Sequence, residues 1–374
     1  MNPVKVGIVG CGNISNAYFG TNAKFSFFDI VACADLNLDA AKAKAEQWNI
    51  AKACSVDELL ADPEIGFVIN LTIPQAHGPV MLKCLENGKS VYTEKPFTVT
   101  REEAQQIIAL ANEKGLRVGS APDTFLGGAH QTCRKLIDDG AIGEVVSATA
   151  FMMGRGHESW HPSPEFYYKV GGGPMFDMGP YYLTDLVQMV GPIHSVSAFS
   201  RITQPQRVIT SKPKRGSLID VEVPTHIAGS FQFQNGAIGT MIMSFDVPSH
   251  TLPAIQIHGT KGSLFVPDPN LFGGKVELRV TGEEPREIEV TLPFAENARG
   301  IGMADMVLAM QKGRDHCCNE RLAYHVLDVM HTFGDSSDQK RHIEIQSTCE
   351  RPLMLSPELQ YNPEPEEAAK GKSS

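Results

Sequence analysis

The sequence has no hydrophobic run long enough to cross a membrane, and it carries no excess of positive charge. No apolar run in its 374 residues approaches the roughly 20 residues that a membrane-spanning helix needs, so we expect no membrane segment. Lys and Arg number 33 against 43 Asp and Glu, a formal net charge of −10. This balance argues against a general nucleic-acid binder. Apolar residues make up 42% of the chain, enough for sizeable cores.

The eight cysteines lack the spacing of a disulfide framework. They are scattered with no C-x-x-C pair, and Cys317 and Cys318 are adjacent. Such usage is typical of free thiols in a reducing compartment. The chain also opens on a strand-like segment from Val4, so we expect no signal peptide and a cytoplasmic protein.

The first third of the chain alternates short apolar runs with Ala- and Glu-rich helical segments. Runs such as KVGIVG, DIVACAD and FVINLT are separated by segments such as LDAAKAKAEQW. Strands that alternate with helices of about 10–15 residues indicate βαβ units and a parallel sheet. We therefore predict an α/β Rossmann domain over residues 1–124, within the two or three domains expected for this length.

The pattern changes after residue 124. Long alternating strands follow, and Asn235-Gly236 between two of them predicts a β-hairpin. We expect an α+β domain over residues 125–355, built on a large, mostly antiparallel open sheet. Residues 356–374 are predicted to form a C-terminal tail, disordered where NPEPEEAAKGKSS lacks apolar residues. Helices are expected near residues 174–190, 297–312 and 319–334.

The run KVGIVGCGNIS places Gly10-x-Gly12-x-x-Ser15 directly after the first expected strand. There Gly10 permits a tight turn, and Gly12 lets a pyrophosphate approach the backbone. Ser15 is small enough for the close packing that a third glycine usually allows, and the following helix N-terminus offers amides to phosphates. The motif in this position predicts a dinucleotide site that includes Gly10, Gly12, Asn13 and Ile14.

Asp35 closes the second expected strand, 23 residues beyond Gly12. An acidic residue in this place binds the adenosine ribose hydroxyls and repels a 2′-phosphate. No Lys or Arg follows before Lys42. We therefore expect NAD rather than NADP as the cofactor. The alternative interpretation of Asp35 is a helix N-cap.

Glu94-Lys95-Pro96 stands at the end of the fifth expected strand. Ligands of open α/β sheets bind beyond the carboxyl ends of the strands, so Lys95 is well placed for chemistry. Pro96 favours an extended backbone at Lys95. A strand-end lysine by itself is usually a surface residue, and its surroundings decide between the two interpretations.

The stretch GHESWHP contains H-E-x-x-H between His157 and His161, the pattern of zinc proteases. Two histidines four residues apart bind one zinc ion only on a helix. Here glycines precede the pattern and Pro162 follows it, which disfavours a helix. The sequence indicates an exposed loop that carries Trp160 and two imidazoles, and no metal site.

Three motifs together resemble one enzyme family. The glycine turn, Glu94-Lys95-Pro96 and GGGPMFDMGPYYLTD at residues 171–185 resemble the Gfo/Idh/MocA oxidoreductases, the family of glucose–fructose oxidoreductase and inositol dehydrogenase. The resemblance covers residues 4–350. It implies an NAD-dependent enzyme that transfers a hydride between nicotinamide and a secondary alcohol or ketone of a sugar, polyol or sugar derivative.

The resemblance implies catalytic roles for three residues. Lys95 would be the acid/base, and Asp177 would bind substrate and orient the lysine. Many members have a histidine four residues after this aspartate; here Tyr181 takes that place, as in the glucose–fructose oxidoreductase branch. Asp177 and Tyr181 share one helix face, where a tyrosine would donate a hydrogen bond or relay a proton. Asp177 taken alone is also compatible with a charge interacting with the helix dipole, and Tyr182 with a core position.

The family pattern implies further contacts with the cofactor and the substrate. Thr72, Pro74 and His77 would lie along the dinucleotide, with Glu94 beside the nicotinamide ribose; His77 is equally compatible with a helix start. The substrate pocket would be lined by aromatic and imidazole side chains, which suit sugar rings and hydroxyls, unless the loop serves as a surface or subunit contact. Its expected members are Trp160, His161, His157, Asp123, Thr124 and Arg299.

Two other functions and an oligomeric assembly are compatible with these motifs. A glycoside-cleaving enzyme that retains NAD would show no net redox change, and a regulator would bind NAD without catalysis. Apolar alternation in AIGTMIMSF, on a sheet face that the protein's own helices leave uncovered, predicts a subunit interface. We expect a homodimer or homotetramer through the C-terminal sheet.

Overall fold

The computed structural model of the protein describes residues 3–362. Most of the predicted disordered tail, residues 363–374, lies outside the described residues. None of the helices within residues 3–362 is both long enough and apolar enough to span a membrane.

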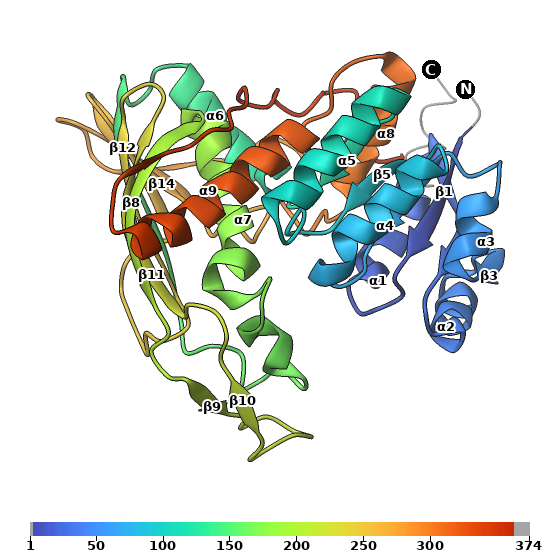
Figure 1. Ribbon diagram of the computed structural model, residues 1–374. Coiled ribbons are helices and arrows are strands. Elements are labelled where there is room, and N and C mark those ends of the chain that lie inside the picture. The colour runs from blue at the N-terminus through green and yellow to red at the C-terminus, as the bar shows by residue number, and fades with distance from the viewer. Residues whose placement is uncertain (1–2, 363–374) are drawn as a thin grey trace, which may run out of the picture.

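Six parallel strands form the first sheet, in the order β3-β2-β1-β4-β5-β6. This is the strand order of a dinucleotide-binding fold, so the predicted α/β Rossmann fold is confirmed. Helix α4 packs against β4 and β5, and α5 lies beside α4 (Figure 1). The strands are β1 Val4–Val9, β2 Phe28–Ala34, β3 Lys52–Cys54, β4 Phe67–Asn70, β5 Ser90–Thr93 and β6 Val118–Ser120, and the helical segments are α1 Ser15–Phe19, η1 Asn22–Lys24, α2 Leu38–Trp48, α3 Val56–Ala61, α4 Pro74–Glu86 and α5 Arg101–Lys114.

Nine strands form the second sheet, in the order β16-β15-β14-β13-β7-β12-β11-β8-β17. All neighbours pair antiparallel except β7 and β12, which are parallel. The predicted large, mostly antiparallel sheet is confirmed, but it is not a simple meander. The strands are β7 Val145–Met153, β8 Ile193–Arg201, β11 His226–Phe233, β12 Ile238–Ser244, β13 Ile255–Gly259, β14 Gly262–Val266, β15 Val276–Val280, β16 Arg286–Ile288 and β17 Ile343–Glu344.

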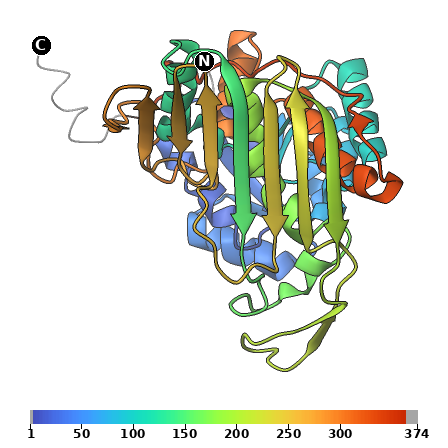
Figure 2. The ribbon, with the colours of Figure 1, turned by 90° about the vertical axis from the view of Figure 1, so that its left-hand side faces the viewer.

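Helices cover one face of this sheet, and Figure 2 shows the other face without them. The open face exposes Phe199 and Ile238 by 82% and 57%. A subunit interface on this face stays a prediction. The remaining elements are η2 Thr124–Leu126, α6 Gly128–Asp138, η3 Pro164–Tyr168, α7 Gly173–Val190, α8 Ile301–Lys312, α9 Glu320–Gln339, and a separate hairpin of β9 Gln206–Val208 and β10 Leu218–Asp220 that projects from the lower end of the sheet in Figure 1.

The predicted hairpin at Asn235-Gly236 joins β11 to β12. Gly236 has φ +90°, a conformation that favours glycine in a tight turn. The Asn235 side chain accepts a hydrogen bond from the N–H of Ala237 at 3.1 Å, which closes the turn. Local turn chemistry was therefore a sufficient guide to this part of the sheet.

The C-terminal third of the chain returns to the Rossmann sheet. Helix α8 packs against β6, and the N–H of Ser120 donates to the carbonyl of Cys318 at 3.0 Å. The residues after 355 also return: Leu359 is buried, and the N–H of Asn362 donates to the carbonyl of Lys24 at 2.7 Å. The predicted boundary at residue 124 thus marks a change of sheet, while residues from beyond 300 help to cover the first sheet.

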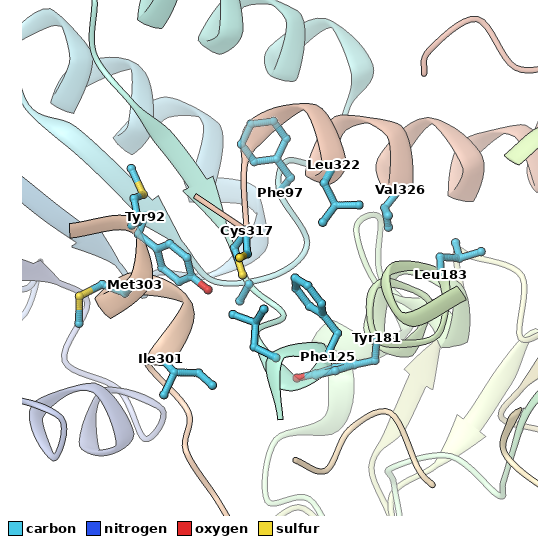
Figure 3. Close-up of a cluster of buried hydrophobic side chains, with 14 of the residues drawn as sticks. Tyr92, Phe97, Phe125, Tyr181, Leu183, Ile301, Met303, Cys317, Leu322 and Val326 are labelled. Carbon is cyan, nitrogen blue, oxygen red and sulfur yellow. The ribbon is translucent and has the colours of Figure 1, made fainter. Parts of the chain in front are cut away.

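Apolar side chains fill the space between the two sheets. Figure 3 shows this cluster, to which β5, η2 and helices α7, α8 and α9 contribute. Its packing fixes the helices that carry the polar groups described below. The labelled members are Tyr92, Phe97, Phe125, Tyr181, Leu183, Ile301, Met303, Cys317, Leu322 and Val326.

A buried ion pair joins α6 to α7. His130 Nδ1 lies 2.8 Å from Asp185 Oδ2, and His130 Nε2 lies 2.9 Å from the carbonyl oxygen of Leu271; both side chains are fully buried. Both ring nitrogens face acceptors and one of these is a carboxylate, an arrangement that favours the doubly protonated imidazolium. Burial opposes this charge, but Asp185 and the two hydrogen bonds raise the pKa of His130 above its usual value.

This pair predicts a pH dependence of stability. A raised pKa in the folded state means that His130 stabilises the fold fully below its ordinary pKa, and that this contribution is lost as pH rises through the folded pKa. We expect the melting temperature to fall over that range in the wild type. The same slope should be absent in His130→Gln, whose amide donates one hydrogen bond but does not titrate. Calorimetry measures the melting temperature of both proteins as a function of pH. Equal slopes in the two proteins would contradict a protonated His130.

Candidate active site

The carboxyl ends of β1, β4 and β5 meet at one edge of the first sheet. The glycine turn follows β1, Thr72 follows β4, and Lys95 follows β5. Strand β1 lies between β2 and β4, so the strand order reverses here. In open α/β sheets ligands bind at such a switch point.

The two glycines of the turn have different surroundings. Gly10 has φ +101°, and a Cβ there would lie 2.6 Å from the Leu71 backbone. A Cβ at Gly12 would meet no atom within 4 Å, so this backbone faces open space. The N–H groups of Gly12, Asn13 and Ile14 donate to no acceptor within residues 3–362. An open cradle of free backbone donors fits the pyrophosphate of a dinucleotide.

Asp35 lies next to this turn. Its Oδ2 accepts the N–H of Cys11 at 2.8 Å, and its Oδ1 accepts the N–H of Asn37 at 2.9 Å. The N-cap of α2 is Asn37, whose side chain accepts the N–H of Asp39. The alternative that Asp35 caps the helix is therefore wrong, and its carboxylate stands at the end of β2 beside the glycine turn.

The loop after β4 places its predicted residues differently. Thr72 is half-buried, and Pro74 is the first residue of α4. His77 is almost fully buried between the carbonyls of Pro96, at 2.7 Å, and Thr72, at 3.1 Å. His77 thus ties this loop to the segment after Lys95, and its ring is not open to a cofactor.

Lys95 and Asp177 form a largely buried ion pair. Lys95 Nζ donates to Asp177 Oδ1 at 2.9 Å and to the Asp177 carbonyl at 2.7 Å, with side chains 17% and 12% exposed. Burial alone would lower the pKa of Lys95, but Asp177 and Tyr181 raise it above its usual value. Burial alone would raise the pKa of Asp177, but Lys95 and His157 lower it to about 2. The pair is therefore an ammonium and a carboxylate at neutral pH.

Tyr181 lies beside Lys95 on the same side of α7 as Asp177. Lys95 Nζ stands 5.2 Å from the centroid of the Tyr181 ring, and the Tyr181 hydroxyl accepts from Arg299 Nη1 at 3.3 Å. Arg299 also lies 3.9 Å from Glu94 Oε1, which accepts the Tyr18 hydroxyl at 2.8 Å. The structure thus brings Lys95, Glu94, Tyr181 and Arg299 together, and Tyr18 of α1 connects them to the glycine turn.

The loop after β7 reaches the same place. Residues 157–161 form turns rather than an α-helix, as predicted. His157 Nε2 lies 3.0 Å from Asp177 Oδ2, whereas His161 Nδ1 accepts the N–H of Ser163 at 3.0 Å. The two imidazoles have different partners, and residues 3–362 hold no group of three potential metal ligands. Trp160 is 60% exposed and meets the His157 ring edge-on at 5.2 Å.

A second ion cluster anchors this loop. Arg207 of β9 pairs with Glu158 at 3.0 Å and with Asp246 at 3.3 Å, and its guanidinium donates to the carbonyl of Phe245 at 3.0 Å. Glu158 also accepts the hydroxyl of Tyr168. Sequence reasoning missed Arg207, because its partners lie about 40 to 50 residues away and no local motif marks it.

Three further residues named in the sequence analysis are buried. Asp123 is fully buried, and its Oδ2 accepts the N–H groups of Gly300 and Gly302 at 2.7 and 3.1 Å. Thr124 and Tyr182 are buried as well. Its carboxylate supplies an acceptor to the first N–H groups of α8, and the expected substrate contact of Asp123 stays a prediction. Asp123 fixes the backbone that follows Arg299.

Comparisons with known proteins agree with this geometry. A family model described as "Oxidoreductase family, NAD-binding Rossmann fold" matches residues 4–121, and the "GFO/IDH/MocA C-terminal domain" matches residues 130–265. An uncharacterized oxidoreductase of Schizosaccharomyces pombe is 32% identical over 207 residues, which are 53% of this chain and 55% of that protein. The chain thus matches about half the length of that relative.

Other relatives are similar over most of their length, and solved structures share the fold. The trans-1,2-dihydrobenzene-1,2-diol dehydrogenase of Xenopus tropicalis is 32% identical over 308 residues, 80% of this chain and 86% of that protein. Levoglucosan dehydrogenase in complex with NADH and L-sorbose superposes with a TM-score of 0.80 at 19% identity, over 92% of this chain and 99% of that chain.

Proposed function

Because the chain belongs to the GFO/IDH/MocA oxidoreductases, we propose that it is an NAD-dependent dehydrogenase of a sugar, a polyol or a related cyclic diol. The observation that carries the proposal is the Lys95–Asp177 pair at the end of β5. It lies at the switch point that also holds the open glycine turn. Two proteins similar to this chain are named as dehydrogenases of a cyclic diol, trans-1,2-dihydrobenzene-1,2-diol, and of levoglucosan.

Each polar group of the site has a role in this reaction. The nicotinamide, when bound, takes up or supplies the hydride. Lys95 would move the proton of the hydroxyl group, as an ammonium donor to a ketone or as a neutral amine acceptor from an alcohol. Asp177 holds the lysine by side chain and backbone carbonyl. The Tyr181 hydroxyl, held by Arg299, would donate to the same substrate oxygen.

Asp35 supports NAD as the cofactor. Its carboxylate lies within a hydrogen bond of the turn that would hold the pyrophosphate. A 2′-phosphate next to this charge would be repelled, whereas ribose hydroxyls would donate to it.

The proposal predicts different pH dependences for the two directions. Lys95 must lose a proton before it accepts one from an alcohol, and Asp177 raises its pKa. The neutral fraction therefore grows about tenfold per pH unit below that pKa. We expect kcat/KM for alcohol oxidation to rise steadily from pH 7 to 9, while ketone reduction does not rise. Asp177→Asn should move the oxidation limb to lower pH, and an unmoved limb would speak against Lys95 as the titrating group.

The direct test is NADH formation by the purified protein. NAD⁺ and NADP⁺ are assayed in parallel against monosaccharides, polyols, cyclic diols and glycosides. Turnover with NAD⁺ supports the proposal. Turnover with NADP⁺ alone contradicts the role of Asp35. Aglycone release without NADH formation, by protein that retains NAD through purification, favours a redox-neutral glycoside-cleaving enzyme.

A further inference from the structure

We propose that His157 is a positioning residue for Lys95, which acts by holding the far oxygen of Asp177. The inference rests on the proposed function, because Lys95 is there the group that moves the proton. It assigns a role to the first histidine of the H-E-x-x-H stretch, whose loop position rules out the zinc-protease geometry.

The carboxylate of Asp177 is shared between two donors. Oδ1 accepts Lys95 Nζ at 2.9 Å, and Oδ2 lies 3.0 Å from His157 Nε2. The three residues come from the end of β5, the loop after β7 and helix α7. Their side chains are 17%, 17% and 12% exposed, so none of these bonds is a surface contact. A carboxylate held at both oxygens cannot rotate, and this fixes where Lys95 Nζ lies.

The hydrogen bonding of His157 connects its ring to Asp177 and leaves no ring nitrogen for the substrate. Since Asp177 is ionised, Nε2 must donate to it. Nδ1 is buried and has no hydrogen-bond partner within residues 3–362. A substrate hydroxyl therefore finds neither ring nitrogen free at the surface. His157 influences the reaction only through the aspartate that it contacts.

The surroundings of His157 hold its ring in this orientation. The ring lies 3.9 Å from the Tyr167 ring and 4.7 Å from the Phe245 ring, measured between centroids. The next residue, Glu158, is fixed by the buried guanidinium of Arg207. The backbone N–H of His157 donates to the hydroxyl of Tyr168 at 3.2 Å. The projecting hairpin of β9 and β10 thus reaches the catalytic lysine through Arg207, the loop and Asp177.

The donated hydrogen bond also tunes the charge that Lys95 meets. A carboxylate that accepts at Oδ2 has part of its charge compensated, so it stabilises the Lys95 ammonium less than a carboxylate with a free Oδ2. Without the imidazole, Lys95 should hold its proton more tightly. Alcohol oxidation should then need a higher pH.

Two matched variants test this role. His157→Phe keeps a ring against Tyr167 and Phe245 but has no donor, and His157→Gln keeps an N–H donor without the ring. For His157→Phe we expect kcat for alcohol oxidation to fall about 10- to 100-fold, the loss of one hydrogen bond to a charged group. Its alkaline limb should move to higher pH, with KM and the Kd for NADH within about threefold of wild type. His157→Gln should recover most of kcat and return the limb toward that of the wild type.

Two results would overturn the role of His157. One is a His157→Phe enzyme with wild-type kcat and an unmoved limb. The other is a loss confined to KM, which would make His157 a substrate contact. A wild type without turnover on any alcohol would refute the proposed function instead. The hydrogen bond is then tested by ¹⁵N imidazole NMR of the wild-type and Asp177→Asn proteins, where an Nδ1–H tautomer of His157 in the wild type contradicts it.

Discussion

Replacing Lys95 with Met should lower kcat/KM for alcohol oxidation by about a hundredfold to ten-thousandfold, the usual contribution of a general acid or base. Methionine has a similar length but neither donates nor accepts the proton. Asp177 keeps its contact with His157 in this variant, so the carboxylate is not left without a donor. The Kd for NADH, followed by fluorescence, should remain close to that of the wild type.

An exposed lysine provides the control. Lys114 lies at the end of α5, where it donates to the carbonyl of Glu86 at 3.3 Å. Lys114→Met should leave turnover unchanged. If Lys95→Met also kept wild-type turnover, the proton would have to move through another group, and the Tyr181–Arg299 pair would be the next one to vary.

Replacing Gly12 with Val should strongly weaken dinucleotide binding while the fold stays intact. A Cβ at Gly12 meets no atom within 4 Å, so the side chain fills only the space in front of the turn. The pyrophosphate needs that same space to reach the backbone donors. We expect NADH affinity to fall by about a hundredfold or more, which corresponds to about 2.7 kcal/mol of binding free energy. The melting temperature should stay that of the wild type.

Gly10 serves as the contrasting site two residues earlier. Its φ is +101°, and a Cβ would meet the Leu71 backbone at 2.6 Å. Gly10→Val should therefore lower the melting temperature of the protein. The two variants separate a cofactor contact from a folding requirement by calorimetry and an NADH titration. Unchanged NADH affinity in Gly12→Val would show that the dinucleotide does not bind at this turn.

Local patterns were enough to predict the first sheet and the chemical motifs on it. The glycine turn, Asp35 and Lys95 follow directly from the ends of β1, β2 and β5, because parallel strands bring their carboxyl ends to one edge. The position of Asp177 near Lys95 came from the family resemblance, since 82 residues separate the two in the chain. Spacing on a helix then correctly placed Tyr181 on the same face.

Contacts between distant segments could not be predicted from the sequence. The pairing of His157 with Asp177, the burial of Asp123 under α8 and the anchor at Arg207 depend on how helices and loops pack in three dimensions. Periodicity reports which face of an element is apolar, but not which element covers it. For the same reason the sequence could not choose between a cofactor contact and a helix-start position for His77, which is buried in the first turn of α4.

The parallel pairing at the centre of the second sheet has a consequence for synthesis on the ribosome. Strand β7 ends at Met153, but its neighbours β12 and β13 begin only at Ile238 and Ile255. While the intervening residues are being made, β7 has two unpaired edges. The first sheet can complete its six strands early, whereas the second must wait and close as a unit across long loops. The nascent chain is therefore most exposed to aggregation when the strands of its first third have been made and those of the second sheet are incomplete.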